Sequence, residues 1–287
     1  MFEKILFPTD FSTHAQAELE CLSGFPDVRE IVLLHIVKKY PVPMGKTMIE
    51  AMVTKTMQGY LDDAKRYLAV LRPGIIITLE MTTSADIAGA ILDAAVKHDA
   101  DLIVISGYVR SFKAGILLGR VPATVLCRIS RTNVLVMPNR LIDALDGNGY
   151  DKFCKSIFSR ILCPTDFSEL SEKAIACAGD TRGVRELMLL HVLPETAGVP
   201  ARADADAKLA VLRDNLAGRG VKVRTFITTG EPAREIARVA DTEDVSVIWM
   251  STSSKGCLVE FLSGSLVHDV VMNGKRPALI VRADSFF

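Results

Sequence analysis

Two nearly identical segments lie 156 residues apart in this chain. Residues 5–12 read ILFPTDFS and residues 161–168 read ILCPTDFS. A second matching pair, LLHIV at 33–37 and LLHVL at 189–193, keeps the same separation. Two independent matches in one register indicate a tandem repeat, and a repeat constrains the architecture before any single element is assigned.

The later parts of the copies also align, but with a shorter separation. The segment that begins at Gly74 matches the one that begins at Gly220, so the first copy carries about ten additional residues between positions 38 and 72. Those residues include a Met-rich stretch in which Met48, Met52 and Met57 have helical spacing. Core packing is the interpretation that we favour, and a lid or partner surface is the alternative.

The boundary between the copies is marked by Asp146-Gly147-Asn148-Gly149, a cluster suited to turns and positive φ. A chain of 287 residues has the length of two ordinary domains. We therefore predict domains at residues 1–147 and 148–287.

Each copy alternates short apolar segments with amphipathic stretches. In the first copy the apolar segments are ILFP, EIVLLHIV, IIITLEM, DLIVIS and NVLVMP, which are typical of strands buried on both faces of a parallel sheet. Helical patterns separate them. The order predicts an α/β fold with a doubly wound, mainly parallel five-stranded sheet in each copy and helices on both faces. Ligands of such sheets bind at the carboxyl ends of the strands.

The charge balance excludes general attraction to polyanions. Lys and Arg total 34, as do Asp and Glu, so the net charge is zero and neither nucleic acid nor anionic lipid is an expected partner. No apolar stretch reaches the roughly 18 residues that a membrane span needs, and the first residues lack a signal-peptide pattern. We expect a cytoplasmic protein whose partners are small molecules or proteins.

Reactive residues do not form a recognisable catalytic set. The six cysteines lack CxxC or zinc-type spacing, and we interpret Cys163 and Cys177 as reduced, structural residues. His35 and His191 occupy matching strand positions, but each stands alone, which favours a structural role over a metal site. No nucleophile motif or Walker-type Gly-Lys-Ser/Thr appears. We predict no catalytic residue and no metal ligand, and whether the protein is an enzyme stays open.

The repeated segments resemble the universal stress protein family. The resemblance rests on a first strand that ends in PTDFS, a second strand that reads LLHV, and a late strand followed by a small-residue loop with ILLG or FLSGS. It covers nearly the whole of both copies and implies tandem Rossmann-like domains of the adenine nucleotide alpha hydrolase-like type. It also implies dimerisation through the last strand and, in some members, ATP or AMP binding through a motif of the form Gly-x2-Gly-x9-Gly followed by Ser or Thr.

The two copies differ at this motif. The second copy has Ser251-x2-Ser254-x9-Gly264-Ser265, which keeps the spacing and replaces two glycines by another small residue. Serine adds a hydroxyl donor, so this loop can still line a phosphate. The first copy has Ser106-x2-Val109-x9-Gly119-Arg120, and β-branched Val109 is poorly suited to positive φ. Arg120 either pairs with phosphate or points to solvent.

Further site residues follow from the resemblance. Asp166 either contacts the ribose or adenine or closes an Asx-turn before the next helix; we favour ligand contact for Asp166 and capping for Asp10. The predicted nucleotide-binding residues of the second copy are Pro164, Thr165, Asp166, Val192, Met250, Ser251, Ser254, Gly264, Ser265 and Leu266. The weaker set in the first copy is Pro8, Thr9, Asp10, Ile36, Ser106, Gly119, Arg120 and Val121.

These patterns lead to three hypotheses. The leading one is a stress or regulatory protein that binds ATP, ADP or AMP, with or without Mg²⁺, mainly in its second copy. The alternatives are an interaction scaffold of the same fold that binds no nucleotide, and a slow ATPase that uses phosphate-bound Mg²⁺ and one carboxylate. The final strands NVLVMP and PALIVR would be exposed edges in isolated domains. We expect them to pair as an intramolecular pseudo-dimer, and a further homodimer stays open.

Overall fold

The strands form one continuous ten-stranded sheet. A computed structural model describes residues 2–38, 47–107, 109–112, 115–129, 131–145, 147–252 and 266–282. The strand order is β10-β9-β8-β11-β12-β7-β4-β1-β2-β3, so each half follows the same path from its centre outward. The bounds are β1 (Lys4–Pro8), β2 (Glu30–Lys38), β3 (Ile76–Ser84), β4 (Leu102–Gly107), β7 (Asn133–Pro138), β8 (Arg160–Pro164), β9 (Glu186–Leu193), β10 (Lys222–Thr229), β11 (Val247–Thr252) and β12 (Ala278–Arg282).

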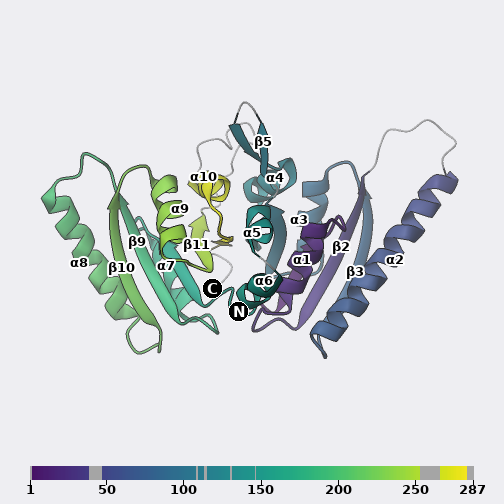
Figure 1. The fold of residues 1–287 in the computed structure, drawn as a ribbon, viewed down its shortest axis with the longest axis horizontal. Helices are drawn as coiled ribbons and strands as arrows, with labels where there is room; N and C mark the ends of the chain where they lie inside the picture. Colours follow the sequence, from purple (N-terminus) through teal and green to yellow (C-terminus); the bar gives the residue numbers. More distant parts are fainter. Residues whose placement is uncertain are drawn as a thin grey trace.

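Helices cover both faces of this sheet, and α2 and α8 lie at the two outer ends of the molecule (Figure 1). One face is covered by α1 (Thr13–Leu22), α2 (Thr47–Leu71), α5 (Asn139–Ala144), α6 (Gly147–Cys154), α7 (Glu169–Gly179) and α8 (Val199–Asn215). The other face is covered by α3 (Ile87–Lys97), α4 (Arg120–Arg128), α9 (Pro232–Thr242) and α10 (Leu266–Asn273). None of these helices combines the length and the apolarity that crossing a bilayer requires.

Burial on both faces explains why the strands are apolar along their whole length. In β1, Ile5 and Phe7 pack into the core beneath α1 and α2, whereas Leu6 points into the opposite core with α3 and α4. All three side chains are almost completely buried. Successive strand residues point to opposite faces, so a sheet with two covered faces has no polar alternation. The predicted α/β fold and its five main strands per copy are confirmed.

Two local expectations were wrong, and one element was not predicted. Gly147 begins α6, so residues 147–149 form a helical turn in place of the predicted turn of positive φ. Met52 is 64% exposed on α2 and does not pack in the core. The segment after β4 forms a separate hairpin of β5 (Val109–Phe112) and β6 (Gly115–Leu118), which the apolar pattern of the main strands did not reveal.

The two halves meet at β7 and β12, which pair antiparallel. The amide side chain of Asn133 lies at this seam: its Nδ2 donates to the Asp101 carbonyl oxygen (2.9 Å), and its Oδ1 accepts from the Arg282 backbone N–H (2.9 Å). Nearby, the ring centroid of buried Trp249 lies 6.1 Å from that of Phe2 and 6.3 Å from that of Phe158. Residues from both halves therefore share one core.

A disulfide fixes α6, the helix that precedes β8, to α1 of the first half. Cys21 of α1 is bonded to Cys154 of α6, with a Cα–Cα distance of 4.6 Å, and both residues are buried. Cys127 is disulfide-bonded as well. Cys163 and Cys177 are free, as predicted. Burial raises the pKa of both free thiols, to about 12 for Cys177, so neither is a ready thiolate nucleophile.

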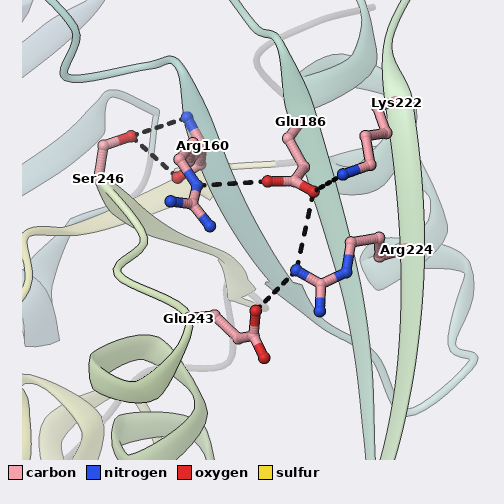
Figure 2. Close-up of polar contacts among 6 residues, drawn as sticks. All are labelled: Arg160, Glu186, Lys222, Arg224, Glu243 and Ser246. Atoms are coloured by element: carbon pink, nitrogen blue, oxygen red, sulfur yellow. Dashed lines mark hydrogen bonds and ion pairs between the residues drawn. The ribbon is translucent and has the colours of Figure 1, made fainter.

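An ion-pair network closes the amino ends of the second half's strands (Figure 2). Glu186, at the start of β9, lies 3.3 Å from Arg160 Nε and 2.9 Å from Lys222 Nζ, and Arg224 links it to Glu243. Lys222 and the other cations hold the pKa of Glu186 below its usual value against the effect of burial. The network therefore lies at the edge of the sheet opposite the carboxyl ends of the strands, where ligands of open α/β sheets bind.

Candidate functional site

Each PTDFS segment folds into the same hydrogen-bonded loop at the end of a central strand. In the second half, Thr165 N–H donates to the Leu190 carbonyl of β9 (2.8 Å), and Thr165 Oγ1 accepts from Phe167 N–H (2.9 Å). Ser168 then caps α7 by accepting from Ser171 N–H (3.3 Å). Thr9, Phe11 and Ser12 repeat these bonds in the first half, to Leu34 and Ala15. The repeated sequence therefore encodes a repeated loop.

A phenylalanine takes a left-handed backbone conformation in each loop. Phe11 has φ 60° and Phe167 has φ 61°, which costs about 1–2 kcal/mol for a residue with a Cβ. Each ring packs on a histidine, with centroid distances of 4.7 Å for Phe11–His35 and 4.5 Å for Phe167–His191. Histidine Nδ1 in turn lies 2.8 Å from the carbonyl oxygen of Thr9 or Thr165. The histidines thus hold the loops, as their predicted structural role requires.

The second half has a cavity of about 320 Å³ at the carboxyl ends of β8, β9 and β11. Seven predicted residues line it: Pro164, Thr165, Asp166, Val192, Met250, Ser251 and Leu266. Ser254, Gly264 and Ser265 lie outside the described residues. From β8 the chain continues outward to β9 and β10 and then returns to β11 on the other side of β8, so the strand order reverses at this point, which is where open α/β sheets bind ligands.

Sequence reasoning missed part of the lining. The cavity of the second half is also bounded by Ser168, Leu170, Ser171, Leu190, His191, Pro232 and Ile236. Pro232 and Ile236 come from α9, and their counterparts Ile87 and Ile91 come from α3. Aligning the two helices on their capping residues, Asp86 and Glu231, would have found these positions, because the caps place both pairs in the same register.

Asp166 is held in place by its own loop. Its Oδ1 accepts from Ser168 N–H at 3.0 Å, which is the Asx-turn that we considered as the alternative to ligand contact. Partial burial acts to raise the pKa of this carboxyl, but hydrogen bonds from Ser168 and Ser171 outweigh burial and hold the pKa below its usual value. A fixed, ionised carboxylate in the cavity wall is suited to accept hydrogen bonds from ligand hydroxyls.

The first half has a larger cavity, of about 470 Å³, at the equivalent strand ends. All eight residues of the weaker predicted set line it: Pro8, Thr9, Asp10, Ile36, Ser106, Gly119, Arg120 and Val121. Leu34, His35, Ile87, Ile91, Ile105 and Pro122 complete the lining and make it predominantly apolar. Asp10 Oδ1 accepts from Ser12 N–H (2.9 Å), which matches the turn expected of it.

A buried carboxyl group lies behind the first cavity. Glu18 of α1 is fully buried, and Ser106 Oγ donates to its Oε2 at 2.6 Å, while Oε1 has no hydrogen-bond partner. Burial raises the pKa of Glu18 to about 8, and the nearby Asp10 carboxylate acts in the same direction. The equivalent residue of α7 is Ala174. The two sites therefore differ beneath the serine that ends the fourth strand.

In the described part of the chain, no group of three or more His, Cys, Asp or Glu side chains is arranged so that it could hold a metal ion. The two cavities instead combine an apolar wall with one carboxylate, a few hydroxyls and, in the first half, one guanidinium. Such a wall and polar set accommodate a flat apolar group that bears hydroxyls.

Comparison with known proteins identifies one family for both halves. The model of the family described as "Universal stress protein family" matches residues 1–138 and again residues 158–282. Among curated proteins, Universal stress protein MJ0577 of Methanocaldococcus jannaschii is 30% identical over 155 residues, which cover 44% of this chain and 96% of that protein. Universal stress protein YxiE of Bacillus subtilis is 29% identical over 148 residues, covering 44% of this chain and 100% of its own length.

A solved structure matches the chain over both halves. The crystal structure of a universal stress protein from Archaeoglobus fulgidus superposes with a TM-score of 0.75 and covers 97% of this chain and 96% of that one. The sequence identity is 19%, so the match shows that the fold is shared.

Proposed function

This chain belongs to the universal stress protein family, and from that premise we propose that it binds an adenine nucleotide, ATP or AMP, mainly in its second half. The observation that carries the proposal is the cavity at the ends of β8, β9 and β11, where a fixed Asp166 carboxylate faces an apolar wall. We place the adenine against Val192 and Met250 and the ribose hydroxyls on Asp166. Ser251, near the end of β11 and beside the cavity, would offer its hydroxyl to the phosphates.

The chemistry of the wall fits a nucleoside. Leu190, Val192, Ile236 and Met250 offer the apolar surface that a base needs, and the Thr165 and Ser171 side chains hydrogen-bond each other at 2.9 Å behind Asp166. One carboxylate can accept bonds from two adjacent hydroxyls. When bound, the phosphates would bring their own Mg²⁺, so the proposal requires no protein-bound metal.

Calorimetric titration with ATP and AMP in the presence of Mg²⁺ tests the proposal. Asp166→Ala should weaken binding about tenfold to a hundredfold, because a hydrogen bond to a charged group is worth roughly 1.5–3 kcal/mol. The matched control is Asp10→Ala, the same change in the first half, which should leave the ATP titration unaltered. Absence of heat for both nucleotides at millimolar concentration would refute the proposal.

An interaction scaffold without a nucleotide is the second candidate. It is favoured by exposed apolar side chains on α2, where Met52 is 64%, Tyr60 48% and Val70 78% exposed. The scaffold hypothesis predicts that Met52→Ser weakens the association of this protein with its protein partner in the cell. It also predicts that no nucleotide co-purifies with the native protein. Adenine nucleotide recovered from the denatured, purified protein would contradict it.

The organisation of the chain completes the proposal. We propose that residues 1–147 and 148–287 are two domains of the same fold that form a pseudo-dimer within one chain, supported by the antiparallel β7–β12 pair. A cytoplasmic location and a homodimer of chains remain part of this proposal. Light scattering tests the homodimer, and cell fractionation tests the location. A stable Cys21–Cys154 bond would count against the cytoplasm, because disulfides are rare in that reducing compartment.

A further inference from the structure

The first cavity has the parts of a nucleoside site. Its volume of about 470 Å³ exceeds that of the second cavity, and Ile87, Ile91 and Ile105 form an apolar wall comparable to the one proposed for adenine. Asp10 occupies the position of Asp166 and is fixed by the same turn. A base and a ribose therefore have equivalent surroundings in both halves.

The surroundings of the phosphates are different. A loop that cradles several phosphates needs backbone N–H groups that point at the anion. Here the backbone of the segment after β4 pairs with itself, from Val109 opposite Leu118 to Phe112 opposite Gly115. Amides that donate across this hairpin are not available to a polyphosphate, and the others point outward on both edges of the ribbon and do not converge on one anion.

Gly107 does not replace the missing loop glycine. A Cβ at this position would lie 2.9 Å from Val136 Cγ1 and 3.2 Å from the Met137 carbonyl oxygen of β7. Glycine is therefore required here for the close packing of β4 against β7. Gly107 thus allows β4 to lie close to β7, and it does not form an anion-binding turn in the first half.

The serine at the end of β4 is also occupied. Ser106 donates its hydroxyl to Glu18, so it is not available to a phosphate oxygen, and a carboxyl group behind it adds no favourable charge. In the second half, Ala174 replaces Glu18 and leaves Ser251 without a carboxyl group at that place.

One cation remains to receive an anion. Arg120, the first residue of α4, is exposed at the cavity and is the only Lys or Arg among the described lining residues. No carboxylate pairs with its guanidinium within the described part of the chain. A guanidinium binds one phosphate group in a bidentate manner, which matches a nucleoside with a single phosphate.

We propose that the first half is a second nucleotide site which accepts a nucleoside with a single phosphate and excludes ATP, with Arg120 as the residue that binds the phosphate. The inference rests on the proposed function, because it assumes that the shared wall and carboxylate bind an adenine nucleoside. It assigns the two halves different ligands: the tri- or monophosphate to the second half, and the monophosphate alone to the first.

Counting bound nucleotides by calorimetry and native mass spectrometry tests this division. We expect two AMP molecules per chain but one ATP. Arg120→Gln should weaken the first-half AMP site at least about tenfold and leave ATP binding unchanged. The matched control is Arg131→Gln, which removes an exposed arginine just beyond α4 and should retain both AMP sites.

Each other result decides a specific claim. One AMP and one ATP per chain, or two ATP, would overturn the division while the proposed function stands. An unchanged AMP titration for Arg120→Gln would overturn the role of that residue. Absence of both nucleotides would overturn the proposed function itself. Circular dichroism of each variant establishes that it is folded before binding is compared.

Discussion

At the scale of single residues, the two halves are most unequal at Glu18. The sequence shows a glutamate in an amphipathic helix, where the usual position is in solvent, and nothing local indicates that it faces the interior. Its burial follows from packing between α1, β4 and α6: Ser106 of β4 donates to it, the Asp10 carboxylate adds to the rise of its pKa, and its own charge adds to the rise in the pKa of Tyr150 on α6. Contacts of this kind depend on the tertiary fold.

Glu18 makes the free energy of unfolding depend on pH. Its pKa is about 8 in the folded protein and near 4.5 in the unfolded chain, so the folded state holds a proton that the unfolded state has released. The stabilisation is complete below pH 4.5 and is lost as the pH rises through 8. The free energy of unfolding of the wild-type protein should therefore fall with rising pH by roughly 3–5 kcal/mol more than that of Glu18→Gln. Urea denaturation at pH 5, 7 and 8.5 measures it.

The comparison between variants isolates Glu18 from other titrating groups. Asp10 and Tyr150 face this carboxyl from the loop after β1 and from α6, and both remain in the Glu18→Gln protein. A parallel pH dependence for the two proteins would show that Glu18 is ionised in the folded state.

At the scale of elements, the main strands were predictable and their connections were not. Apolar segments such as DLIVIS are buried on both faces, which leaves a direct pattern in the sequence. The strands β5 and β6 pair with each other outside the main sheet, so the pattern of the main strands did not predict them, and the Gly-rich start of α6 has a composition typical of turns. The helix forms there because α6 packs tightly on α1: a Cβ on Gly24 would clash with the Cys154 carbonyl.

The strand ends opposite the cavity depend on Glu186. Glu186→Gln should lower the free energy of unfolding at pH 7 by about 2 kcal/mol, because Lys222 and Arg160 lose their charged partner at a nearly buried position. Since the pKa of Glu186 is lowered on folding, its contribution is present above pH 4.5 and is lost as the pH falls further. Denaturation by urea, which is uncharged and does not screen ion pairs, at pH 7 and pH 3.5 tests both statements.

An exposed ion pair provides the control. Asp204→Asn removes the partner of Lys208 on the surface of α8, and we expect a change below about 0.5 kcal/mol. Equal losses for Glu186→Gln and Asp204→Asn would contradict a special role for the network in Figure 2.

At the scale of the whole molecule, the repeat gives one sheet and one shared core. The duplicated PTDFS loops create two equivalent cavities, and the β7–β12 pair joins the halves that carry them. The resemblance of the sequence to the family predicted seven lining residues of the second cavity, four of which lie in β8, β9 and β11. It did not predict the Cys21–Cys154 bond, because these residues are 133 positions apart and only the docking of α6 brings them together.

The disulfide should stabilise the molecule substantially. Closing a loop of this length reduces the entropy of the unfolded chain, which corresponds to about 4–5 kcal/mol. Cys21→Ala/Cys154→Ala should lose that amount without reductant, measured by urea denaturation with Trp249 fluorescence as the reporter of the shared core. Peptide mapping without reductant checks the bond, and finding both thiols free would contradict this account.

The central claim is that the halves share a scaffold and differ in what they bind. A crystal structure of the protein grown with ATP and Mg²⁺ tests it most directly. We predict nucleotide density in the second cavity, with the base against Val192 and a ribose hydroxyl within hydrogen-bond distance of Asp166, and no triphosphate beside Asp10. A triphosphate bound in the first cavity, or no nucleotide in either cavity, would contradict the account.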